Sequence, residues 1–232
     1  MTFSDLVPRQ LGAQAAAGEL TAGLLPLVDY FRLGQTFERI GRFGIAVRGR
    51  AYSALLFSRK PIRLLERAAI AMTQESSTSV CLLRLILEER YHLKPIFYSR
   101  GYNPQADALL LIGDEALRFQ QTSTAYPYET DLAFEWWLWQ HLPFVFAVWG
   151  IRKDAGPSEK QHLERTLART LALNTSQLES IAKEQAVAFQ RPVEELHRYL
   201  STFIYRLSQP EEEAIERFRF LLEETGIGRG NE

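Results

Sequence analysis

The chain has 232 residues, of which 46% are hydrophobic and 24% are charged, and its formal net charge is −1. This composition excludes intrinsic disorder, and the near-zero charge gives no reason to expect nucleic-acid binding, which depends on clustered positive charge. The single cysteine, Cys81, cannot form an internal disulfide, and the four scattered histidines lack the spacing of a metal site. We therefore expect neither a metal nor another cofactor.

The first half of the chain alternates helical and strand patterns. An alanine-rich segment over 10–20 predicts a helix, and the strongly apolar segment 76–90 predicts another. Short apolar runs predict strands at 22–27, 43–47, 51–57, 68–72, 96–98 and 108–112. Strands that alternate with helices indicate a largely parallel sheet with both faces covered.

The second half is mostly helical. Residues 131–139 predict a short helix that leads into a strand at 142–149, and four helices follow at 158–173, 175–190, 192–207 and 210–226. The apolar stretch 132–151 contains Glu135, and a carboxylate in mid-bilayer costs roughly 2.5–3.5 kcal/mol. The N-terminus also lacks the basic start and apolar run of a signal peptide. We therefore expect a soluble, cytoplasmic protein without a membrane partner.

A hydroxyl-rich turn is the first candidate site. Ser76-Ser77-Thr78-Ser79 lies between the strand that ends at Met72 and the helix that follows it. Free backbone N–H groups, hydroxyl donors and the positive end of a helix dipole would together bind a carboxylate or a phosphate. The alternative is that one of these residues is simply the N-cap of the helix.

A second candidate lies at the end of the strand 108–112. Gly113 and Asp114 follow this strand, at the edge where open α/β sheets bind ligands. Asp114 would either orient a substrate hydroxyl or cap the next helix. The adjacent Glu115 should point elsewhere, so the two carboxylates do not form a convincing acid/base pair.

Several segments together carry a family resemblance. They are residues 18–26, 53–61, 76–83, 107–117 and 131–149, and the most specific strings are Leu-Leu-Ile-Gly-Asp-x-Ala-Leu and Leu-Pro-Phe-Val-Phe-Ala-x-Trp. The combination resembles the menaquinone-biosynthesis proteins of the futalosine route, above all the chorismate dehydratase family. The resemblance extends over nearly the whole chain.

The resemblance implies an α/β fold like that of type II periplasmic binding proteins, with two α/β lobes, a cleft and C-terminal helices. One lobe would comprise residues 1–57 and 141–232, and the other residues 58–140. Strands near Ser53 and Val145 would cross between the lobes, and closure of the cleft would exclude water. The fold alone does not decide between catalysis and binding.

The resemblance also implies a reaction and a set of site residues. Family members are lyases that remove water from chorismate, a dicarboxylate, to give 3-[(1-carboxyvinyl)oxy]benzoate, without a cofactor. The expected substrate-binding residues are Ser53, Ser76, Thr78, Ser79, Gly113, Asp114 and His141. Asp114 is also the possible catalytic group, and His141 stands where the family commonly has glycine.

One departure from the family leaves alternatives open. Family members usually begin with a strand and an Asn-bearing loop that contributes to the active site, and this chain starts after that point. We therefore expect that the true start lies upstream or that the chain is a non-catalytic remnant. The alternatives to a chorismate lyase are a protein that only binds a small carboxylate and the sister enzyme that acts on a later intermediate of the route.

Overall fold

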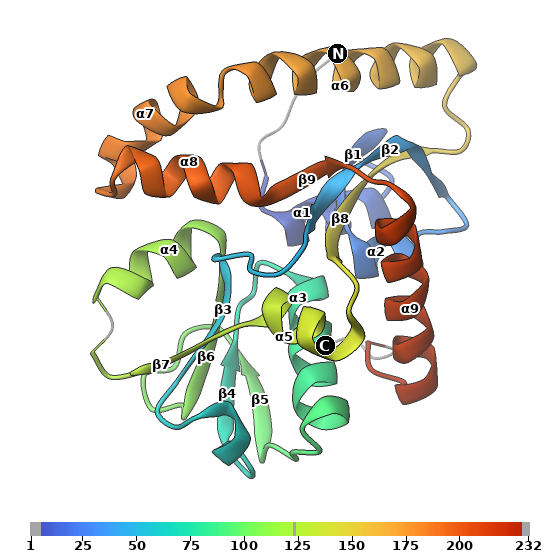
Figure 1. Cartoon of the computed structure of the whole chain (residues 1–232). Coiled ribbons are helices and arrows are strands. Elements are labelled where there is room, and N and C mark those ends of the chain that lie inside the picture. Colours follow the sequence, from blue (N-terminus) through green and yellow to red (C-terminus); the bar gives the residue numbers. More distant parts are fainter. Residues whose placement is uncertain (1–5, 123, 229–232) are drawn as a thin grey trace.

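The computed structural model describes residues 6–122 and 124–228, and these residues form two β-sheets (Figure 1). The first sheet has the order β1 (Ala22–Pro26), β8 (Phe144–Arg152), β2 (Phe37–Val47) and β9 (Phe203–Arg206), and each neighbouring pair is antiparallel. β1 and β2 run in the same direction and are joined by a short helix. They are not neighbours, because β8 lies between them and runs the opposite way.

The second sheet has the order β5 (Phe97–Arg100), β4 (Ala69–Met72), β6 (Ala108–Ile112), β3 (Ala54–Ser58) and β7 (Tyr128–Asp131). β4 is parallel to β5 and β6, whereas β3 is antiparallel to β6 and β7. The expectation of a largely parallel sheet was therefore wrong. The reason is that β3, the first strand of this sheet along the chain, is antiparallel to the strands that follow it.

The helices surround the two sheets (Figure 1). They are α1 (Pro8–Ala16), α2 (Leu27–Arg32), α3 (Ser77–Leu85), α4 (Gly113–Thr122), α5 (Leu132–Gln140), α6 (Pro157–Ser176), α7 (Leu178–Phe189), α8 (Val193–Thr202) and α9 (Gln209–Thr225), with short helical turns at Ile62–Leu64 and Ile86–Arg90. The predicted helix 192–207 ends early, because residues 203–206 pair with β2 as strand β9. None of the described helices is long and apolar enough to cross a membrane.

Helix α3 lies in a core that the two sheets share. One cluster of buried side chains contains Val47 and Val148 from the first sheet, Leu56 and Leu110 from the second, and Leu82 from α3. Each of these five side chains is fully buried. An apolar helix with buried residues on all its faces must be covered on all sides, which explains why the predicted helical segment 76–90 lacks a polar stripe.

The chain passes between the sheets in the loop before β3 and again after α5. Asp131, at the end of β7, holds the first of these crossings, since the Tyr52 N–H donates to Asp131 Oδ2 over 2.8 Å. The expected lobe boundary at residue 57 falls inside β3, which pairs entirely within the second sheet. The exact division of the chain into lobes stays a prediction.

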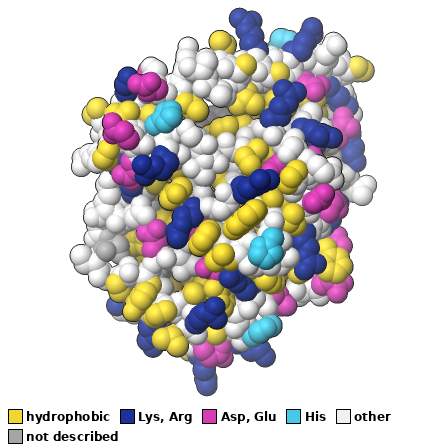
Figure 2. Space-filling view, in the orientation of Figure 1, with side chains coloured by type: hydrophobic (Ala, Val, Ile, Leu, Met, Phe, Trp, Pro, Cys, Tyr) yellow, Lys and Arg dark blue, Asp and Glu magenta, His cyan; other side chains and the backbone are white. Residues whose placement is uncertain are grey.

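The outer surface carries charges of both signs. Figure 2 shows Lys and Arg side chains scattered over one face of the molecule, with Asp and Glu side chains among them. The charged groups on this face therefore do not form a patch of one sign, as the formal net charge of −1 leads one to expect.

Candidate functional site

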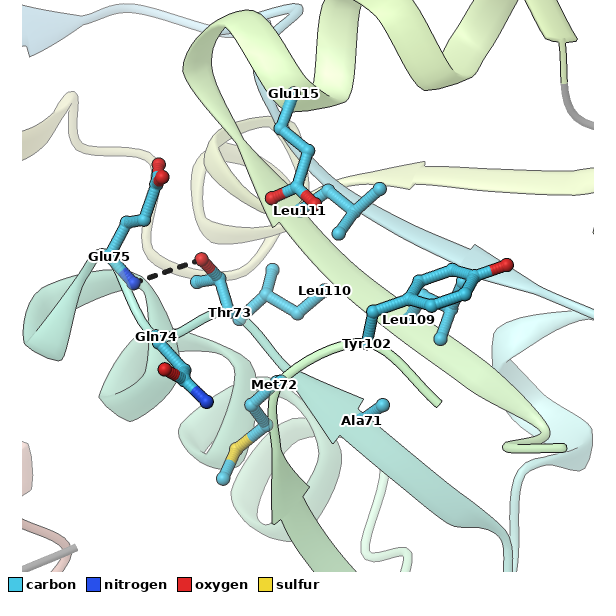
Figure 3. Close-up of a pocket in the computed structure, with 11 residues that line it drawn as sticks. Ala71, Met72, Thr73, Gln74, Glu75, Tyr102, Leu109, Leu110, Leu111 and Glu115 are labelled. Carbon is cyan, nitrogen blue, oxygen red and sulfur yellow. Dashed lines mark hydrogen bonds between the residues drawn. The ribbon is translucent and has the colours of Figure 1, made fainter. Parts of the chain in front are cut away.

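Two turns come together at one edge of the second sheet. One turn joins β4 to α3 and the other joins β6 to α4, and they are neighbours because β4 and β6 are adjacent parallel strands. A pocket of about 260 Å³ opens between them, and we call it the strand-end pocket (Figure 3). Its lining consists of Ala71, Met72, Thr73, Gln74, Glu75, Gly101, Tyr102, Leu109, Leu110, Leu111 and Glu115.

Two carboxylates reach the strand-end pocket from different elements. Glu75 belongs to the turn before α3, where its N–H donates to Thr73 Oγ1 over 3.1 Å, and Glu115 lies in the first turn of α4 (Figure 3). Burial raises the pKa of Glu115, and the negative charge of Glu75 raises that pKa further. A carboxyl group with a raised pKa in a pocket is a candidate for acid/base chemistry.

The serine-rich turn is packed inside the protein. Ser76, Thr78 and Ser79 have exposed fractions of 5%, 0% and 2%. Ser76 is the N-cap of α3, because its Oγ accepts the Ser79 N–H over 3.0 Å, and Thr78 Oγ1 accepts the Val28 N–H over 3.1 Å. The three side chains do not line the strand-end pocket. The alternative interpretation, that one of these residues is the N-cap of the helix, is therefore confirmed. A substrate-binding role for these side chains stays a prediction.

Ser53, Gly113 and Asp114 lie together beside this pocket. The Gly113 N–H donates to the Ser53 carbonyl oxygen over 2.7 Å, and Asp114 is an exposed residue in the first turn of α4. The Tyr199 hydroxyl donates to Ser53 Oγ over 3.0 Å. Burial raises the pKa of Tyr199, and electrostatic interactions with Tyr205 and Asp114 raise it further. The structure therefore brings three of the expected site residues together, although it does not test what they bind.

His141 lies apart from this group. It is exposed, it ends α5, and its N–H donates to the Trp137 carbonyl oxygen over 2.9 Å. Its φ of 56° is in the left-handed region, where a helix C-terminus usually has glycine. The positive φ explains why the resembled family commonly has glycine at this position. Binding of substrate by His141 stays a prediction.

Glu75 and Tyr199 were not predicted from the sequence, and Glu115 was considered there but set aside. Glu115 lines a pocket that also contains Glu75 (Figure 3). A signal was available for both glutamates, since each follows an apolar strand at the edge where parallel strands end. No local signal marks Tyr199, because it reaches Ser53 from a helix 146 positions further along the chain.

Comparisons with known proteins identify a family. The model of a family described as menaquinone biosynthesis matches residues 2–224. The chain is also 30% identical, over 233 aligned positions, to the chorismate dehydratase of Thermus thermophilus. That alignment covers 91% of this chain and 83% of the relative.

Solved structures show the same architecture. A protein of Archaeoglobus fulgidus matches with a TM-score of 0.73 at 19% identity, over 96% of this chain and 85% of its own. The alkanesulfonate-binding protein of Xanthomonas axonopodis pv. citri matches with a TM-score of 0.65 at 14% identity, over 96% and 80% of the two chains. A Candida albicans protein with the generic periplasmic-binding-protein fold matches with a TM-score of 0.58 at 7% identity, over 95% and 78%. The expected α/β fold of the periplasmic-binding-protein type is thus confirmed.

Proposed function

This chain belongs to the menaquinone biosynthesis family, and from that premise we propose that it is a lyase of the chorismate dehydratase type. It would convert chorismate to 3-[(1-carboxyvinyl)oxy]benzoate and water in the cytoplasm, as one step of the futalosine route. The similarity to a chorismate dehydratase along 91% of the chain carries this proposal.

The reaction needs a base and an acid on one substrate. The base takes a proton from the ring carbon that bears the enolpyruvyl ether, and the C–H electron pair forms a new C=C bond. The neighbouring C–O bond breaks, and its oxygen leaves as water after it accepts a proton. The ring becomes aromatic, which drives the elimination, so the protein mainly has to orient the substrate and place these two groups.

The strand-end pocket offers the two groups. The raised pKa of Glu115 favours its protonated form, so we assign it the role of proton donor to the leaving hydroxyl group. Glu75 would act as the base. Asp114, in the same turn of α4, is the alternative to Glu75, as the sequence suggested.

Binding of the two substrate carboxylates would involve residues near this pocket. Ser53, Gly113 and Asp114 are grouped at the β6–α4 turn, so Ser53 and Gly113 are the proposed contacts. Ser76, Thr78 and Ser79 would first have to exchange their internal hydrogen bonds for bonds to the substrate.

The test is to mix the protein with chorismate and to follow the ultraviolet absorbance of an aromatic product. Mass spectrometry should show that the product has lost one water. Glu115→Gln should lower kcat by about 100-fold, in the range typical of a lost general acid, whereas Glu184→Gln on the exposed face of α7 should not change it. Binding of chorismate without any product would contradict the lyase proposal and favour a carboxylate-binding protein.

A further inference from the structure

A second pocket lies between α4 and α8, and we call it the α4–α8 pocket. It has a volume of about 190 Å³ and lies on the other side of α4 from the strand-end pocket. Its lining consists of Tyr52, Leu117, Gln120, Arg191, Glu195, Leu196, Arg198 and Tyr199. Glu195, Arg198 and Tyr199 have the spacing that places side chains on one face of a helix.

Arg191 is a buried cation in the wall of this pocket. Its side chain is 9% exposed, and its guanidinium pairs with Glu195 and donates to Gln120 Oε1 over 2.8 Å. Its Nε is buried and has no hydrogen-bond partner within the described part of the chain. The Arg191 guanidinium is therefore a positive charge that its bonds to Glu195 and Gln120 hold in place at the wall of the pocket.

Arg198 adds a second positive charge to the lining. Across residues 6–122 and 124–228, its guanidinium has no ion pair and no hydrogen bond. The lining therefore holds the cations Arg191 and Arg198 against the single carboxylate of Glu195. This excess of one positive charge matches a ligand with one carboxylate group, which a guanidinium binds through two parallel hydrogen bonds.

Two tyrosines make part of the lining aromatic. Tyr52 has a φ of 62°, an unfavourable value for a bulky side chain, and the bond from its N–H to Asp131 Oδ2 holds it there. Its side chain is nevertheless 38% exposed. A strained residue that presents an aromatic ring to a pocket is a feature of binding sites, and Tyr199 adds a second ring.

We propose that the α4–α8 pocket binds a small organic monocarboxylate with a planar ring. The carboxylate contacts Arg198 beside the fixed positive charge of Arg191, and the ring packs against the two tyrosines. Arg191 already links the turn before α8 to α4, through bonds to Gln120 and to the Leu117 carbonyl oxygen. A ligand bound here therefore strengthens the contact between α8, which leads into the first sheet, and α4, which follows the second.

The test uses benzoate as the probe and isothermal titration calorimetry of the full chain as the measurement, without chorismate. Arg198→Gln should weaken benzoate binding at least tenfold, and because Arg198 is exposed the variant should stay folded. Arg118→Gln is the matched control, because Arg118 is an exposed arginine of α4 that contacts Phe189 instead of the pocket. Benzamide, the neutral analogue, should not bind.

Three results would overturn this proposal. They are unchanged benzoate affinity in Arg198→Gln, equal binding of benzamide, and a benzoate affinity that changes in Glu115→Gln instead. The last result would place the ligand in the strand-end pocket. The proposal does not rest on the chorismate reaction, since turnover of chorismate is measured separately and its absence would leave the benzoate result unaffected.

Discussion

Thr78 and Val28 join two helix starts that lie 50 positions apart in the chain. Thr78 Oγ1, in the first turn of α3, accepts the N–H of Val28, in the first turn of α2, over 3.1 Å, and both residues are buried. α2 follows a strand of the first sheet and α3 follows a strand of the second. This single hydrogen bond therefore connects the two halves of the fold next to the strand-end pocket.

Thr78→Val tests how much this bond contributes to stability. Valine has the same shape but no acceptor, so the Val28 N–H would stay buried without a partner. We expect the free energy of unfolding, measured by urea denaturation, to fall by about 1–3 kcal/mol. Thr175→Val is the control, because the Thr175 hydroxyl only bonds back to the Leu171 carbonyl oxygen on an exposed helix. Equal losses in the two variants would contradict the prediction.

Tyr199 and Tyr205 provide a second matched pair. Both tyrosines have a pKa raised by burial, but among the residues that the structure describes only Tyr199 finds a hydrogen-bond acceptor, Ser53 Oγ. Tyr199→Phe should therefore lower the free energy of unfolding by about 1 kcal/mol, and Tyr205→Phe should change it by less. Thermal or urea denaturation of both variants measures the difference. If both variants lose the same amount, the bond to Ser53 has no separate contribution.

The part of the fold that could be predicted from sequence is the part with local signals. The N-cap of the helix after residue 76 and the strand 108–112 follow from residue types at fixed spacings. Strand β9 was missed because residues 203–206 continue a helical pattern, and only their pairing with β2 makes them a strand. Tertiary contacts override local preference there.

The candidate site was less predictable than the fold. Ser76, Thr78 and Ser79 look like ligand donors in the sequence, since nothing local shows that α3 is covered by both sheets. Glu115 was set aside because it was expected to point away from its neighbour Asp114, and the glutamate that shares its pocket, Glu75, comes from a distant segment. Which side chains share a pocket depends on strand order, which local patterns do not determine.

Glu115 should make stability depend on pH in a defined direction. Because burial and Glu75 raise its pKa in the folded state, the folded protein binds this proton more strongly than the unfolded chain does. Folding stability must then decrease as the pH rises through the range just above the ordinary glutamate pKa. Glu115→Gln removes this contribution, so its Tm relative to wild type should rise as the pH increases above about 4.5. Glu184→Gln, at an exposed position, should show no such trend.

Arg39 and Glu212 should give the opposite pH dependence. Arg39 on β2 holds Glu212 of α9 with two hydrogen bonds, of 2.5 and 2.7 Å, and the two side chains are only 19% and 28% exposed. The hydrogen bond from Arg39 lowers the pKa of Glu212. A lowered folded-state pKa contributes stability above the unfolded value, and this stability is lost as the pH falls through the folded value.

Arg39→Gln should therefore lower the free energy of unfolding by about 1–2 kcal/mol at neutral pH, and by less in acid. Urea denaturation at a series of pH values measures both effects. The control is Arg219→Gln, whose partner Glu216 is 3.5 Å away and 67% exposed, so its loss should be small at every pH. A constant difference between wild type and Arg39→Gln down to about pH 3 would show that the Glu212 carboxylate does not contribute through its charge. The contact between α9 and β2 would then be stabilised by packing alone.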